Sequence, residues 1–117
     1  MRMWMVNPKI MCKQHLIGEY RELFTFMGAV REKKSISGYI KNNLLEPLSV
    51  KNRYEVLKSE MINRNYKPKK EFIVQDMNYI SKKELNNKVN VHKSLNDLLN
   101  RCPECKKRFV SGFLSQR

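Results

Sequence analysis

An amphipathic helix over residues 14–31 is the strongest constraint that this sequence places on its fold. At about 100° per residue, one side of the helix carries a continuous apolar stripe. The stripe consists of Leu16, Tyr20, Leu23, Met27 and Val30. Polar groups gather on the opposite side, at Gln14, His15, Arg21, Glu22 and Thr25, around Gly18, which lets a ligand approach the backbone. The pattern therefore predicts a core on one side and a binding or reaction surface on the other.

The charge balance limits which ligand that surface can take. The chain has 117 residues, in which 24 Lys and Arg outnumber 11 Asp and Glu, for a net charge of +13. This length predicts a single domain over residues 1–117. The basic excess favours a polyanion, most commonly nucleic acid, although a merely basic protein is the plainer alternative. Because the basic residues are spread along the chain, a membrane partner is not expected.

The apolar segments and the cysteines indicate the compartment. No apolar run approaches the roughly 18 residues that span a bilayer, and Asn7-Pro8-Lys9 interrupts the short apolar start, which does not resemble a signal peptide. An odd number of cysteines, three, favours free thiols in a reducing compartment. We expect a cytoplasmic protein, associated with nucleoid or viral DNA.

The remaining pattern predicts further helices and little else. The first helix should end near Lys34, and a second should begin near Ser49, which can act as its N-cap. Residues 67–80 read as irregular, with a possible strand at 72–74 that has no obvious partner. Residues 81–84 have the spacing of a capping box. A third helix follows over residues 91–101, and residues 102–109 form a compact basic tail. The whole reads as a small, mostly helical domain.

Residues 14–31 closely resemble the first helix of the phage-type pyrimidine-dimer DNA glycosylases, the small endonuclease V-like repair enzymes. The shared segments are Gln-His-Leu, Glu-Tyr-Arg-Glu-Leu and Gly-Ala-Val-Arg at the same spacings. A weaker likeness continues at residues 74–76 and in the third helix before Arg101. The resemblance implies an all-α single domain of three main helices, with the N-terminal segment packed between them.

The resemblance also implies an activity: removal of a damaged pyrimidine base from double-stranded DNA, then cleavage of the strand at that site. The nucleophile would be the α-amino group of the first residue, which forms a Schiff base with the deoxyribose, and Glu22 would be the acid/base. Arg2, Gln14, His15 and Arg21 would contact DNA, and we place Arg31, which closes the motif, with them. An α-amine suits this role because α-amines as a class titrate well below lysine side chains. The chemistry needs no cofactor and no metal, and a monomer suffices.

The start of the chain departs from the family. The phage enzymes begin Met-Thr-Arg and expose the threonine amine, whereas this chain begins Met1-Arg2. Counting back from His15 puts Met1 at the threonine position, so we expect a retained Met1 to supply the amine. This account requires the amine to lie within a few ångströms of the Glu22 carboxyl group.

Two departures within the helix leave the substrate open. Thr25 stands where the family has an arginine, and Phe24 replaces a proline. The alternative is therefore a related DNA-binding protein, or a lyase acting on another modified or abasic nucleotide.

Several other residues have a structural interpretation. Glu19 is expected to be a surface charge, and Trp4, Phe24 and Phe26 are expected in the core rather than stacked on bases. The pairs Cys12-x-x-His15 and Cys102-x-x-Cys105 together make a Cys₃His set of possible zinc ligands if the fold brings them together. Zinc is kept only as an alternative, because the metal would occupy His15, which the resemblance assigns to DNA. A chain with this zinc site would be a zinc-clamped basic adaptor that does no chemistry.

Overall fold

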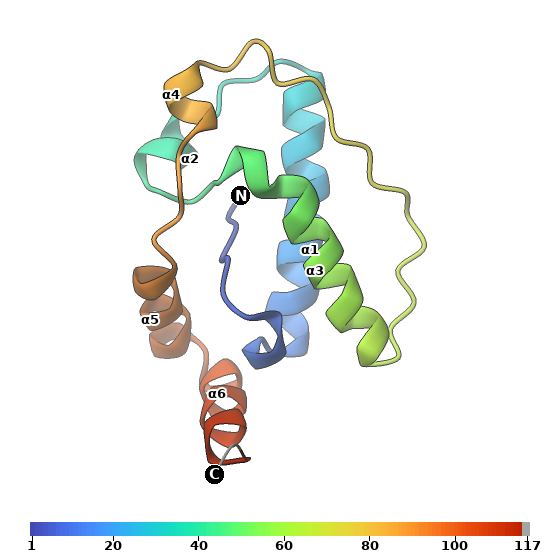
Figure 1. Ribbon diagram of the computed structural model, residues 1–117, viewed down its shortest axis with the longest axis vertical. Helices are drawn as coiled ribbons and strands as arrows, with labels where there is room; N and C mark the ends of the chain where they lie inside the picture. The colour runs from blue at the N-terminus through green and yellow to red at the C-terminus, as the bar shows by residue number, and fades with distance from the viewer. Residues whose placement is uncertain (116–117) are drawn as a thin grey trace.

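The computed structural model describes residues 1–115, and side chains as far as residue 112, and every element in this range is helical (Figure 1). The four long helices are α1 (Lys13–Arg31), α3 (Val50–Asn63), α5 (Val91–Arg101) and α6 (Pro103–Ser115). Two short helices, α2 (Ser37–Lys41) and α4 (Lys82–Leu85), and two 3₁₀ turns, η1 (Pro8–Ile10) and η2 (Pro47–Ser49), connect them. The predicted all-α class is confirmed.

The three helices predicted from the pattern are present, with small differences at their ends. α1 ends at Arg31, short of Lys34, and Lys33 just beyond it has a left-handed φ of 56°. α3 begins directly after Ser49, but the Ser49 side chain does not cap it and instead donates to the Glu46 carboxylate. The predicted helix start at Ser81 is confirmed as an N-cap, because the Ser81 hydroxyl accepts the backbone N–H of Glu84 at 3.2 Å. The Glu84 carboxylate accepts from the Ser81 hydroxyl, whereas in a full capping box it accepts from the backbone N–H.

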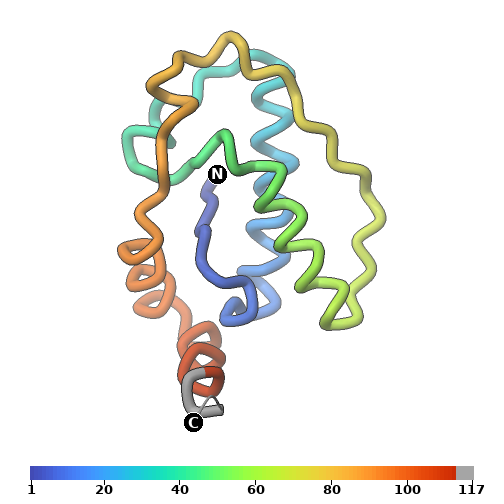
Figure 2. Tube along the Cα trace, in the orientation of Figure 1, coloured from blue at the N-terminus to red at the C-terminus, as the bar shows by residue number. Residues whose placement is uncertain are grey.

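Two segments differ from what the sequence predicts. The tail after residue 101 is the helix α6, with Pro103 at its first position, where a missing N–H breaks no hydrogen bond. The segment between α3 and α4 contains no strand: Phe72 is buried, but Ile73 is 59% exposed. This segment returns along the outside of α3 (Figure 2), and the Tyr79 hydroxyl donates to the Lys34 carbonyl at 2.6 Å beyond the end of α1.

The core forms where α1 packs on α3. All five residues of the predicted apolar stripe are buried. Four aromatic rings continue this core toward the segment that follows α3, with Tyr54 and Phe72 stacked at 4.4 Å between ring centroids. Tyr20 and Phe24 complete the group, and burial raises the pKa of Tyr20 to about 12. Trp4 and Phe26 are buried and Phe24 is partly buried against this core, as expected.

The expectation that Glu19 is a surface charge is wrong. Glu19 is only 2% exposed, and its two carboxylate oxygens accept hydrogen bonds from the Arg53 guanidinium at 2.6 and 2.8 Å. Arg53 lies on α3 and is itself buried. The two helices are therefore joined by a buried, bidentate ion pair. Two parallel hydrogen bonds make such pairs strong.

The N-terminal segment, residues 1–7, lies between the helices, as expected, and hydrogen bonds hold it from three sides (Figure 1). The Met3 N–H donates to the Leu44 carbonyl at 2.8 Å in the connector after α2. The Trp4 carbonyl accepts from the Ser94 hydroxyl of α5 at 2.7 Å, and the Val6 carbonyl accepts from Arg53 of α3 at 2.7 Å. These three hydrogen bonds fix the position of the N-terminal segment in the fold.

Candidate active site and nucleic-acid surface

The polar side of α1 faces outward. Gln14, Arg21 and Thr25 are exposed, whereas His15, Gly18 and Glu22 are half-buried. The apolar stripe on the opposite side of α1 is in the core, so one side of this helix packs and the other faces solvent.

The α-amine of Met1 lies next to the carboxylate of Glu22. The nitrogen is 4.0 Å from Glu22 Oε2, and the Glu22 side chain is 43% exposed. The Met1 side chain is only 7% exposed, so it packs inward and anchors the end of the chain. The amine and the carboxylate therefore lie side by side on two half-buried residues.

A concavity of about 360 Å³ opens beside this pair. Met1 lines it together with residues from the second half of α1 and from the turn that follows. Thr25 and Arg31 are both part of its lining, and Tyr39 of α2 completes it. Arg31 thus brings a guanidinium to the concavity that Thr25 also lines.

Two other arginines, Arg64 and Arg101, are engaged in contacts elsewhere. Arg64 pairs with Glu60 at 2.7 Å and donates to the Pro8 carbonyl at 3.0 Å. Arg101 pairs with Asp97 at 2.9 Å on α5. By contrast, none of the ion pairs among the described residues includes Arg21 or Arg31. Arg31 is exposed and lines the same concavity as Met1.

Arg2 is held by contacts within the protein. Its guanidinium donates to Asp97 of α5 at 2.7 Å and lies 3.6 Å above the centre of the Trp4 ring. The hydrogen bond from Arg2, with help from Arg101, lowers the pKa of the Asp97 carboxyl group. Asp97 and Arg53 are thus positioning residues for the N-terminal segment. Sequence reasoning missed both, because no local pattern marks a partner that is distant in the chain.

A family model described as pyrimidine dimer DNA glycosylase matches residues 1–74. The chain belongs to this family. Comparisons with curated proteins and with solved structures gave no match. The matched residues include the N-terminal segment, α1 and α3, and therefore both the Met1 amine and Glu22. Membership implies a DNA substrate, and none of the described helices is long and apolar enough to cross a membrane.

The part of this glycosylase-family chain beyond residue 74 carries α5 and α6, which contact the matched part through the N-terminal region. α6 packs on η1, and Arg108 donates to the Lys9 carbonyl at 2.9 Å. At the same junction, His15 turns its Nδ1 toward Cys12 and Cys105. Burial lowers the pKa of His15, which disfavours the positively charged form of the ring that would attract a phosphate. Its expected DNA contact stays a prediction.

Replacing Gly18 with alanine tests whether a ligand approaches this face of the glycosylase-family helix. A Cβ at this position would meet no heavy atom within 4 Å beyond the helix's own nearby backbone. We therefore expect Gly18→Ala to stabilise the protein by up to about 1 kcal/mol, since alanine is the better helix former. The same methyl group should weaken DNA binding several-fold if DNA lies against Gly18. Denaturant unfolding and DNA titration measure the two effects.

Gly38→Ala is the matched control, because its Cβ would also meet open space on the short helix α2. It should leave DNA binding unchanged. Equal DNA affinity of the Gly18→Ala protein and wild type would show that no ligand approaches the helix at this point.

Proposed function

We propose that the protein is a DNA glycosylase with associated lyase activity, which acts on pyrimidine dimers through the α-amine of Met1. The amine attacks C1′ of the damaged nucleotide, and the base leaves with the electron pair of the glycosidic bond and takes up a proton. Opening of the sugar ring gives an iminium, the Schiff base between the Met1 nitrogen and C1′. Glu22 then removes a proton from C2′, the C3′–O bond breaks with loss of the phosphate, and water releases the enzyme.

The position of the amine carries this proposal. A distance of 4.0 Å between the Met1 nitrogen and Glu22 Oε2 leaves both groups within reach of one sugar. A carboxylate here stabilises the positive charge that develops at C1′ and is also positioned to accept the C2′ proton. The inward packing of the Met1 side chain and the bonds at Met3, Trp4 and Val6 hold the amine in place before substrate binds.

The surface around the amine suits DNA. Arg21 and Arg31 are exposed on α1, and the chain carries a net charge of +13. Guanidinium groups bind phosphate through paired hydrogen bonds, and such contacts position a duplex without reading its sequence. A larger concavity of about 740 Å³ lies between η1 and α3, but Glu55 and Glu60 line it, so it is less suited to a phosphate backbone. DNA is therefore expected over α1, with the damaged nucleotide turned out toward Met1.

Borohydride trapping tests the proposal directly. Borohydride reduces an iminium to a stable amine, so a duplex with an abasic site should become covalently attached to the protein. Peptide mapping by mass spectrometry should place the attached sugar on Met1. Attachment to a lysine instead would contradict the role of the Met1 amine, and DNA binding without any attachment would indicate a binding protein.

A second substrate separates the proposal from a lyase with another target. Thr25, exposed where the family has an arginine, favours that alternative, because a lost phosphate contact weakens the hold on a distorted duplex. A duplex containing a pyrimidine dimer should be trapped as well as the abasic duplex if the protein removes dimers. Trapping on the abasic duplex alone would support the alternative. In either case we expect the protein to act on intracellular DNA.

A further inference from the structure

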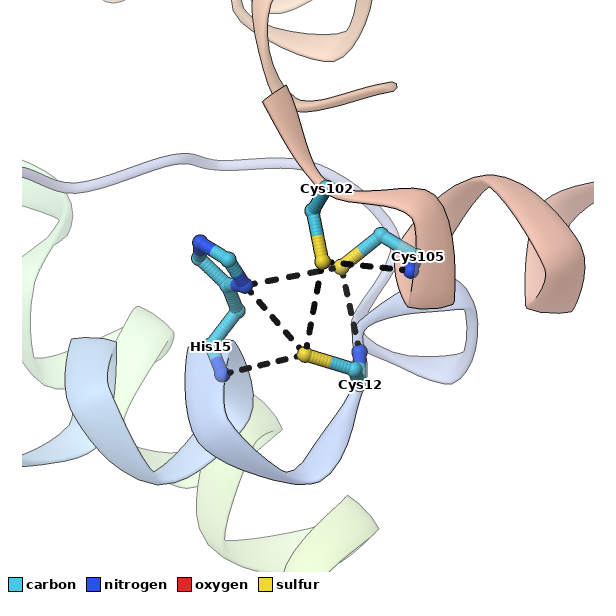
Figure 3. A group of neighbouring side chains, drawn as sticks. All are labelled: Cys12, His15, Cys102 and Cys105. Carbon is cyan, nitrogen blue, oxygen red and sulfur yellow. Dashed lines mark hydrogen bonds between the residues drawn. The ribbon is translucent and has the colours of Figure 1, made fainter. Parts of the chain in front are cut away.

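Four side chains with metal-binding atoms converge where the start of α1 meets the junction of α5 and α6 (Figure 3). They are Cys12, His15, Cys102 and Cys105, and their sulfur and nitrogen atoms all lie within 4.8 Å of one another. All three cysteines are free thiols. The Sγ atoms of Cys12 and Cys102 are 3.7 Å apart, well beyond the roughly 2.05 Å of a disulfide bond. The cluster therefore contains three thiols rather than one disulfide bond and a third cysteine.

The spacing within the cluster matches a tetrahedral metal site. With zinc–sulfur bonds of about 2.3 Å and a zinc–nitrogen bond of about 2.05 Å, tetrahedral angles place two sulfurs about 3.8 Å apart and sulfur about 3.6 Å from nitrogen. The observed separations are 3.7 Å from Cys12 Sγ to Cys102 Sγ and 3.8 Å from Cys105 Sγ to His15 Nδ1. Cys12 Sγ lies 3.2 Å from the same nitrogen. A small outward movement of one side chain would admit the ion.

The backbone around the cluster favours thiolates. Each sulfur accepts a backbone N–H: Cys105 Sγ from Cys12 at 3.2 Å, Cys12 Sγ from His15 at 3.4 Å, and Cys102 Sγ from Cys105 at 3.4 Å. Such outer hydrogen bonds orient the ligands of a metal and stabilise their negative charge. Cys12 is also the N-cap of α1, and Cys102 directly precedes α6, so the positive ends of two helices meet here. Cys102 is also the C-cap of α5, whose negative end lies at the same junction.

We propose that Cys12, His15, Cys102 and Cys105 bind a structural Zn²⁺ ion. Three thiolates and one imidazole are a ligand set typical of closed, four-coordinate zinc sites, and they leave no position for a substrate. Cys105 is fully buried, and Cys12 and Cys102 are each less than a tenth exposed, as a structural site requires. The two pairs lie 90 residues apart in the chain, one within the family match and one beyond it.

The ion would fasten α5 and α6 to the part of the chain that carries the amine. α5 supplies Asp97, which holds Arg2, and Ser94, which holds the Trp4 carbonyl. Zinc at the end of α5 would therefore fix the surface against which the N-terminal segment is positioned. It also assigns His15 to the metal through Nδ1, with its other ring nitrogen pointing away from the sulfurs (Figure 3).

The metal content of the untagged wild-type protein is the first test. We expect about one zinc per chain by elemental analysis after dialysis. After removal of the metal under reducing conditions, Co²⁺ should bind at one ion per chain and give the intense visible absorption of tetrahedral cobalt, with sulfur-to-cobalt charge-transfer bands in the near ultraviolet. Loss of the metal should lower the melting temperature by about 10 °C, and added Zn²⁺ should restore it.

Matched histidine variants locate the site. The chain has two histidines, and His92 is exposed on α5 outside the cluster. His15→Asn should lose most of its zinc and shift the cobalt spectrum, whereas His92→Asn should behave as wild type. Cys102→Ser should lose zinc in the same way. Each variant is analysed for metal by equilibrium dialysis against Zn²⁺.

The wild-type measurements keep the proposal open to refutation even if a variant does not fold. A wild-type protein that contains no zinc and takes up neither Zn²⁺ nor Co²⁺ stoichiometrically would overturn it. Equal zinc content of the His15→Asn and His92→Asn proteins would also overturn it. These readouts do not depend on the glycosylase reaction, so the zinc site and the proposed function can fail separately.

Discussion

Glu22→Gln is expected to reduce strand cleavage at an abasic site by about 10²–10⁴-fold, the range over which a positioned acid or base contributes to catalysis. Glutamine keeps the shape of the side chain and its hydrogen-bonding reach, but it cannot act as a base and has no negative charge to stabilise the iminium. Because Glu22 is 43% exposed and its ion pair with Met1 is long, the fold should not depend on it. DNA affinity should stay within a few-fold of wild type or rise, since a negative charge is removed from a DNA-facing surface.

A carboxylate on another helix supplies the control. Glu55→Gln makes the same change in net charge on the exposed side of α3, where Glu55 lies 4.0 Å from Lys51. Cleavage by this variant should equal that of wild type. If Glu22→Gln cleaves DNA as fast as Glu55→Gln does, another group must remove the C2′ proton. Single-turnover gel assays under saturating protein separate this step from binding.

The helix that carries the site could be predicted from the sequence because its information is local. An apolar residue every third or fourth position defines one buried side whatever packs against it, and all five stripe residues are indeed in the core. The opposite face and the Ser81 N-cap of α4 follow from the same local geometry. The family resemblance then connected Glu22 to the first residue, and the structure brings the two groups to 4.0 Å.

The sequence could not predict contacts that depend on distant partners. Glu19 sits at the edge of the apolar stripe, where a long charged side chain ordinarily reaches water. Arg53, 34 residues away, changes this outcome because α3 crosses α1 at that point. The same limit applies to the cysteines. Their spacing suggested two half-sites, but only the packing of α6 on η1 brings the halves together. Helix α6 itself was missed because the cluster of basic residues after Cys105 reads as a solvated tail.

Breaking the Glu19–Arg53 pair is expected to have the largest effect on stability. Glu19→Gln should lower the free energy of unfolding by about 3–5 kcal/mol, because it leaves the buried Arg53 guanidinium without a compensating charge. Lys51→Met, which breaks an exposed pair on α3, should lower it by less than about 1 kcal/mol. Urea denaturation at pH 7 measures both. A loss as small for Glu19→Gln as for Lys51→Met would show that water reaches the pair.

Replacing both partners separates stability from positioning. In Glu19→Leu/Arg53→Met no charge is left buried, so much of the lost stability should return, since apolar side chains of similar volume often replace a buried ion pair at little cost. The Val6 carbonyl, however, loses the 2.7 Å bond from Arg53, and an unpaired buried carbonyl costs about 1–3 kcal/mol locally. The N-terminal segment should then be held by two hydrogen bonds, at Met3 and Trp4, rather than three. We expect the double variant to be folded yet trapped on abasic DNA more slowly than wild type. Wild-type trapping rates in this variant would mean that the anchors at Leu44 and Ser94 suffice to position the Met1 amine.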